Sequence, residues 1–184
     1  MTGADQPSVL VVAIGNPDRG DDGFGPAVAQ RLRGRVPPTA RILERGGDAL
    51  ALIEDWDGIP SVIVIDAMAP ISEPGQVHRF DLTESPLPIG FAPSSTHALG
   101  VKETVELARS LGRLPQCLLA YFVEGEQFET GTPLSPVIAA AVEDVAVRVA
   151  CPGRRRVLRF DRPWIRAGDR LRHAATASRS SRAR

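Results

Sequence analysis

Three side chains with metal-binding chemistry stand beside predicted strands and helices. Asp22 lies in the glycine-rich segment Gly15–Gly25 (GNPDRGDDGFG), Asp66 follows the apolar run Ser61–Ile65 (SVIVI), and His97 lies in the segment SSTHALG. Two carboxylates and one imidazole form a donor set suited to first-row transition metals such as Zn, Ni or Fe. We therefore expect these three side chains to converge on one ion.

The glycine-rich segment does not have the sequence of a phosphate-binding loop. Gly15 and Gly20 have the spacing of a Walker A turn, but Asp21 and Asp22 occupy the places of its Lys and Ser/Thr. Two carboxylates would repel a triphosphate, and Val28 stands where a dinucleotide fingerprint needs its third glycine. The segment is better suited to oxygen ligands for a cation. Asp21 is predicted only to cap the following helix, a contribution of roughly 1 kcal/mol.

The elements that must position these residues alternate between strand and helix. Such alternation predicts βαβ units and an α/β fold, with a mostly parallel sheet covered by helices on both faces. Ligands of such sheets bind at the carboxyl ends of the strands, where Asp22, Asp66 and His97 are all expected. The predicted strands are Ser8–Ile14, Ala40–Leu43, Ser61–Ile65, Cys117–Val123, and Gln76–Asp81, the last as an edge strand or half of a hairpin. The predicted helices are Gly23–Leu32, Asp48–Glu54, Thr96–Leu111 with a Ser94–Thr96 cap, and Ser135–Val149.

Length and composition favour one globular domain with a charged extension. The chain has 184 residues, of which 43% are hydrophobic and 24% charged, enough for a packed core and too many apolar residues for overall disorder. Residues 1–151 are predicted to form the single domain. Residues 152–184 hold 11 arginines against two acids, a net charge of +9, and are predicted to be a disordered basic tail. The tail lacks a nucleic-acid-binding module, so no nucleic-acid partner is expected.

Sequence features also bear on the compartment. No apolar run approaches the roughly 20 residues that span a bilayer, so no membrane association is expected. The first residues are polar and acidic, unlike a secretory signal. Cys117 and Cys151 are far apart and form no CxxC pair, which argues against a disulfide scaffold or a cysteine-based zinc site. The sequence therefore predicts a cytoplasmic protein, and we expect a monomer.

Four blocks of the sequence resemble the hydrogenase maturation proteases. In chain order they are VVAIGNPDRGDDGFGPAVAQRL in the first loop, VIVIDA around Asp66, STHALG around His97, and GEQFETGTPLSP over residues 125–136. The resemblance spans about residues 8–150. It implies a single three-layer α/β domain with a mostly parallel, five-stranded sheet.

The resemblance also implies an activity and a site. Enzymes of this family are endopeptidases that remove a C-terminal extension from the nickel-loaded precursor of the [NiFe] hydrogenase large subunit. The family's metal-contacting residues fall on Asp22, Asp66 and His97. The nickel arrives with the substrate, and no organic cofactor is implied. Candidate substrate-binding residues lie on neighbouring loops: Asn16, Gly46, Gly47 and Asp48.

Two positions depart from the family pattern. The first-loop ligand is often Glu, whereas here it is the shorter Asp22. Some members carry an acid directly before the paired glycines, where this chain has Arg45 between Glu44 and Gly46. If that acid assists hydrolysis, the sequence does not identify its replacement.

The sequence leaves the mechanism and two other classes of function open. It has no HExxH zinc-protease helix, and Cys117 makes a poor nucleophile because it opens a predicted buried strand. A serine route through Ser94 or Ser95 with His97 is conceivable, but residues so close along one turn need not align for attack. A metal-assisted route is therefore favoured. Either metal polarisation or carboxylate-assisted attack by water would cleave the peptide. The alternatives are a flavodoxin-like small-molecule or nucleotide-binding module, and a non-catalytic binder of the hydrogenase precursor.

Overall fold

The computed structural model describes residues 7–46, 49–88 and 100–150. These ranges lie within one compact unit, Met1–Gly153. The predicted basic tail, residues 152–184, lies outside the described residues, and so do Gly47, Asp48 and His97.

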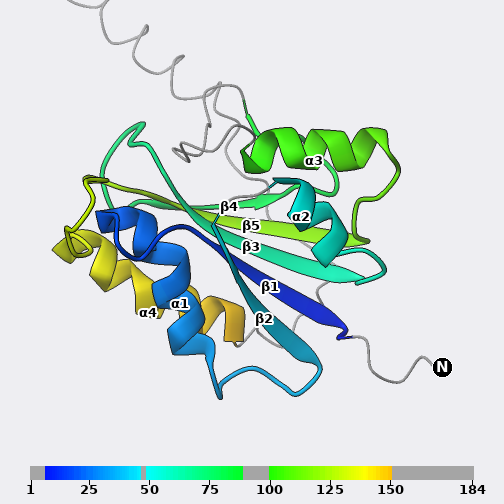
Figure 1. The fold of residues 1–184 in the computed structure, drawn as a ribbon, viewed down its shortest axis with the longest axis horizontal. Helices are drawn as coiled ribbons and strands as arrows, with labels where there is room; N and C mark the ends of the chain where they lie inside the picture. The colour runs from blue at the N-terminus through cyan, green and yellow to red at the C-terminus, as the bar shows by residue number, and fades with distance from the viewer. Residues whose placement is uncertain (1–6, 47–48, 89–99, 151–184) are drawn as a thin grey trace, which may run out of the picture. The chain divides into compact units, whose positions relative to one another are not determined.

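One five-stranded sheet organises the described chain (Figure 1). Its strand order is β2-β1-β3-β5-β4, and every neighbouring pair is parallel except β4 and β5. This confirms the predicted mostly parallel sheet, including the edge strand β4. The strands are β1 (Val9–Ile14), β2 (Ala40–Arg45), β3 (Ser61–Met68), β4 (Val77–Asp81) and β5 (Cys117–Glu124).

Helices cover both faces of the sheet. Helices α1 and α4 pack on one face, and α2 and α3 on the other (Figure 1). A short 3₁₀ turn, Gly20–Gly23, leads into α1. The helices are α1 (Phe24–Leu32), α2 (Ala49–Asp55), α3 (Val101–Ser110) and α4 (Pro136–Ala150). The three layers expected from the sequence are therefore present.

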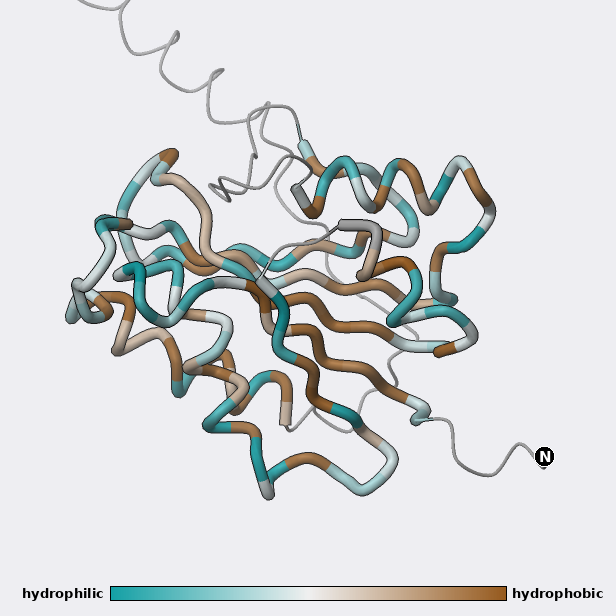
Figure 2. The backbone as a smooth tube through the Cα atoms, in the orientation of Figure 1, coloured by the Kyte–Doolittle hydropathy of each residue, from teal (hydrophilic) through white to brown (hydrophobic). Residues whose placement is uncertain are grey.

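Each face of the sheet has its own apolar core. Trp56 and Phe122 are buried in the core under α2 and α3, whereas Phe24 and Ile138 are buried under α1 and α4. The strands between these cores are predominantly apolar, as Figure 2 shows for β1, β3 and β5. Continuous rather than alternating hydrophobicity is what a parallel strand buried on both faces requires.

Two predicted boundaries are wrong in ways that bear on the site. Strand β3 does not stop at Ile65 but continues to Met68, because β5 extends with it and pairs Met68 with Glu124. Helix α3 begins at Val101, not at Thr96. Its N-cap is Gly100, whose N–H donates to Glu103 Oε2 at 3.1 Å, so the predicted Ser94–Thr96 cap does not start this helix.

The longest described helix, α4, has 15 residues, short of the roughly 20 that cross a bilayer. Within residues 7–46, 49–88 and 100–150, no helix has the length and apolarity of a membrane span.

Candidate active site

The first loop starts where β1 leaves the sheet. Gly15 has φ of +131°, and a Cβ at this position would overlap the backbone carbonyl of Asp22. Only glycine tolerates both conditions. The Gly15 N–H donates to the carbonyl of Arg45 at 3.0 Å, which joins the loop to the end of β2. The loop therefore folds back on itself and delivers Asp22 to the carboxyl edge of the sheet.

Asp22 is almost completely buried, with 4% of its surface exposed. Its Oδ2 accepts a 3.1 Å hydrogen bond from the backbone N–H of Asn16 and lies 3.8 Å from the guanidinium of Arg19. Asn16, predicted to bind substrate, is itself exposed, and its backbone N–H holds the Asp22 carboxylate in place.

Asp66 lies inside the carboxyl end of β3 and is fully buried. Its Oδ1 accepts the N–H of Ala67 at 2.8 Å, whereas its Oδ2 has no hydrogen-bond partner among the described residues. Burial raises the pKa of Asp66 well above its ordinary value; the Ala67 N–H opposes this, and the charge of Asp22 adds to it. The carboxyl is thus desolvated, close to a second acid and incompletely satisfied.

The positions of the two acids follow from the topology of the sheet. From β1 the chain crosses first to β2 and later to β3 on the opposite side, so β1 and β3 flank the switch point. A Cβ at Gly25 would overlap Ile14 and closely approach the carbonyl of Ile65. The first turn of α1 therefore packs directly against the ends of both strands, which holds the Asp22 loop beside β3.

The remaining predicted site residues are only partly covered by the structure. His97, Ser94, Ser95, Gly47 and Asp48 lie outside the described residues. No group of three or more His, Cys, Asp or Glu side chains that could hold a metal occurs in residues 7–46, 49–88 and 100–150. The three-ligand site therefore stays a prediction. The sequence also placed His97 in the first turn of its helix, which is wrong for α3, since that helix begins four residues later.

Asp21 is not a simple helix cap, and that prediction is wrong. It is fully buried, and the 3₁₀ turn Gly20–Gly23 has no side-chain cap hydrogen bond. Its Oδ1 accepts the N–H of Ser135 at 2.7 Å, while Oδ2 accepts the Ser135 hydroxyl at 3.0 Å and the N–H groups of Glu126 and Gln127 at 2.8 and 3.0 Å. Asp21 therefore joins the first loop to the segment before α4.

One further buried carboxylate, Glu124, was not identified from the sequence. Glu124, at the end of β5, is fully buried and binds His78 Nε2 through Oε1 at 2.7 Å. It also accepts the N–H groups of Ile71 and Ser72 and the Ser72 hydroxyl. Although burial alone would raise it, these hydrogen bonds lower the pKa of Glu124 to about 2. Its signal in the sequence was an acid ending an apolar strand, the same signal that identified Asp66.

Arg45, where this chain departs from the family pattern, joins the end of β2 to α2. Its guanidinium makes a two-pronged contact with Asp55 of α2, at 2.7 and 2.6 Å. Glu44 instead pairs with Arg33 beyond the end of α1, at 2.7 Å. Gly46, predicted to bind substrate, is exposed, and a Cβ there would meet nothing within 4 Å.

Comparison with known proteins supports the family suggested by the sequence blocks. The model of the hydrogenase maturation protease family HycI matches residues 26–151. The chain is 30% identical over 146 residues to the hydrogenase expression/formation protein HupD of Bradyrhizobium diazoefficiens, covering 78% of this chain and 76% of that protein. HupM of Azotobacter chroococcum is 30% identical over 162 residues, covering 86% and 77%.

The chain belongs to the hydrogenase maturation protease family.

Solved structures agree with this assignment. The hydrogenase maturating endopeptidase HybD from Escherichia coli superimposes with a TM-score of 0.65 at 26% identity, covering 77% of this chain and 88% of that one. The [NiFe] hydrogenase maturation protease HybD from Thermococcus kodakarensis gives 0.60 at 27% identity, covering 77% and 95%. The family is one of endopeptidases, so the two buried acids at the sheet edge belong to a peptidase fold.

Proposed function

We propose that this maturation protease removes the C-terminal extension of a nickel-loaded [NiFe] hydrogenase large-subunit precursor. Membership of the family and the names of its solved members support the substrate class. The observation that carries the proposal is the incompletely satisfied carboxyl of Asp66, fully buried and close to Asp22. A buried acid with an unpartnered oxygen needs a cation or a proton to complete it.

The substrate's nickel is the cation that this proposal assigns to the pair. Carboxylate oxygens are competent ligands for a divalent first-row metal, and a histidine adds the nitrogen donor that such metals accept. Asp22 and Asp66 would contribute the oxygen ligands, and His97 is proposed as the third. The enzyme then binds the metal centre of its substrate and fixes the scissile peptide beside it, which raises the rate by positioning.

Backbone N–H groups of the protein position the two carboxylates before the substrate binds. The Asn16 N–H fixes Asp22 Oδ2, and the Ala67 N–H fixes Asp66 Oδ1. Each carboxylate therefore has one oxygen fixed by a backbone N–H, and the other oxygen of each is the proposed metal ligand. Two oxygens held by backbone donors cost little reorganisation when the substrate arrives.

The test is processing of a purified nickel-loaded precursor, followed by the mobility shift of the large subunit on a gel. Asp22→Asn and Asp66→Asn should abolish processing, because an amide replaces one anionic oxygen. Asp18→Asn, in the same loop but exposed, is the matched control and should process at the normal rate. Precursor lacking nickel should not be processed by the unaltered enzyme.

Three outcomes would contradict the proposal. Equal cleavage of nickel-free and nickel-loaded precursor would remove the metal from substrate recognition. Stable co-purification with uncleaved precursor, unaffected by Asp22→Asn, would indicate a binder and not an enzyme. A thermal shift with nucleotides and none with the precursor would favour the flavodoxin-like alternative.

A further inference from the structure

Arg19 lies beside one of the two acids that the proposed function assigns to the metal. Its Nη1 is 3.8 Å from Asp22 Oδ2, the oxygen that also accepts the Asn16 N–H, and its Nη2 donates to the carbonyl of Phe128 at 3.5 Å. The Arg19 side chain is 24% exposed and that of Asp22 only 6%, so water and salt screen this pair less than a pair at the surface. A positive charge is therefore built into the protein next to a proposed cation ligand.

We infer that Arg19 is a specificity-determining residue, whose charge weakens the binding of free divalent cations at Asp22 and Asp66 and so favours nickel that is held in the precursor. The inference rests on the proposed function and adds to it the discrimination between free and substrate-bound metal.

The loop that follows β5 holds the backbone around Arg19 in place. The Asp18 carbonyl accepts the N–H of Gly131 at 2.7 Å, and the Gly20 N–H donates to the carbonyl of Thr132 at 3.0 Å. A Cβ at Gly20, which has φ of +56°, would overlap the side chain of Thr132. The residues on both sides of Arg19 are thus fixed, which keeps its guanidinium beside the carboxylate.

The neighbouring buried acids are compensated in a different way. Asp21 is satisfied by N–H and hydroxyl donors, and Glu124 by such donors together with His78. The arginine beside Asp22 also compensates a buried carboxylate, but its full positive charge repels a cation that approaches that carboxylate. This second effect acts on ligands and not on the fold.

A repulsive group placed against the wrong ligand is a general source of specificity. A free divalent cation meets Arg19 with its full charge, whereas a metal held in a protein is partly neutralised by the anionic ligands that it already has. The precursor also contributes contacts between its own polypeptide and the enzyme. The repulsion therefore lowers affinity mainly for the free ion.

The test is a calorimetric titration of the purified full-length protein, stripped of metal with a chelator, with Ni²⁺ alone. Arg19→Gln should lower the Kd for Ni²⁺ at least tenfold, whereas Arg19→Lys keeps the charge and should stay within about threefold of the unaltered protein. A merely structural role of Arg19 predicts the opposite sign, because a distorted site binds metal more weakly. Circular dichroism melts of each variant follow the fold in parallel.

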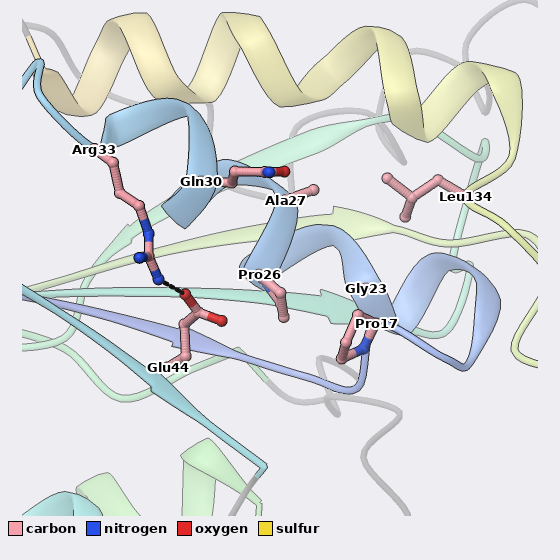
Figure 3. Close-up of a pocket in the computed structure, with 8 residues that line it drawn as sticks. All are labelled: Pro17, Gly23, Pro26, Ala27, Gln30, Arg33, Glu44 and Leu134. Atoms are coloured by element: carbon pink, nitrogen blue, oxygen red, sulfur yellow. Dashed lines mark hydrogen bonds and ion pairs between the residues drawn. The ribbon is translucent and has the colours of Figure 1, made fainter.

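Arg33→Gln is the matched control. Arg33 pairs with Glu44 at 2.7 Å in the wall of a cleft, at the end of α1 away from Gly23 (Figure 3). The substitution removes the same charge from an acid, but at the other end of the helix, and should leave the Kd for Ni²⁺ within twofold. Asp22→Asn combined with Arg19→Gln should cancel the gain, because the carboxylate through which Arg19 acts is then neutral.

A second measurement follows the reaction. Free Ni²⁺ should inhibit processing of nickel-loaded precursor by Arg19→Gln at a concentration at least tenfold lower than for the unaltered enzyme. Unchanged or weaker Ni²⁺ binding by Arg19→Gln, or an equal gain in Arg33→Gln, would overturn the role of Arg19 and leave the proposed function intact. Failure of the unaltered enzyme to process the precursor would overturn the proposed function and this inference together.

Discussion

Replacing Asp21 by alanine should destabilise the protein far more than loss of a helix cap. The substitution removes an acceptor of four hydrogen bonds from the segment 126–135. Both donors of Ser135 are buried, whereas the N–H groups of Glu126 and Gln127 are partly exposed and can recover water. Leaving a buried donor unsatisfied costs about 1–3 kcal/mol, and more where the lost partner was charged.

The expected loss in unfolding free energy is therefore about 3–4 kcal/mol, against roughly 1 kcal/mol for a cap. For a domain of this size it corresponds to a fall in Tm of roughly 6–16 °C. Circular dichroism melts and urea titrations measure both quantities. Asp18→Ala, exposed in the same loop, is the control and should change stability by less than about 0.5 kcal/mol.

A double-mutant cycle separates this contact from other effects of the substitution. Ser135→Ala removes only the hydroxyl bond to Asp21 Oδ2 and should cost about 1 kcal/mol. In the Asp21→Ala background the same change should cost almost nothing, because its partner is already absent. The reasoning is refuted if Asp21→Ala loses about 1 kcal/mol or less, or if the two substitutions are additive.

Three further predictions follow from the other acids and His97. Asp66→Asn should abolish precursor processing yet raise the unfolding free energy by about 1 kcal/mol, since it removes a buried, partly unsatisfied carboxyl; a fall in Tm would contradict this. The pKa of Glu124 is about 2 in the folded state, against an ordinary value of 4.5. Its contribution to the unfolding free energy is therefore complete above about pH 4.5 and is lost as the pH falls from there to about 2, which urea titrations from pH 6 to pH 2 should show. Glu124→Gln should be less stable at neutral pH, and its stability should depend less on pH in this window. His97→Ala should stop processing of nickel-loaded precursor while leaving the melting curve unchanged; normal processing would exclude His97 as a ligand.

The fold could be predicted because its signals are local. Apolar runs such as Ser61–Ile65 fix the strands, and helical spacing between them fixes the crossovers. The ends of helices and strands cannot be predicted from local sequence where contacts with distant residues decide them. Strand β3 extends to Met68 only because β5 continues beside it, and a Ser/Thr cluster was a misleading start signal for a helix capped by Gly100 and Glu103.

The roles of individual acids depend on donors that lie far away in the sequence. Asp21 and Asp22 are adjacent and identical in type, yet the N–H groups that satisfy Asp21 come from residues more than 100 positions later. No pattern around residue 21 contains that information. The sequence did assign the two acids different roles, but it gave Asp21 a cap where the structure has a buried tertiary link.

The buried carboxylates at this edge differ in how fully the protein satisfies them, and this difference supports the proposal that Asp66 binds the metal of the substrate. Asp21 and Glu124 each accept four hydrogen bonds, so their charge is compensated within the protein. Asp66 is as deeply buried but accepts one bond, from the next residue, and its other oxygen has no partner in the described part of the chain. Evolution for stability alone would satisfy or remove such a group. The metal of the proposed substrate would complete this group, beside Asp22 at the switch point.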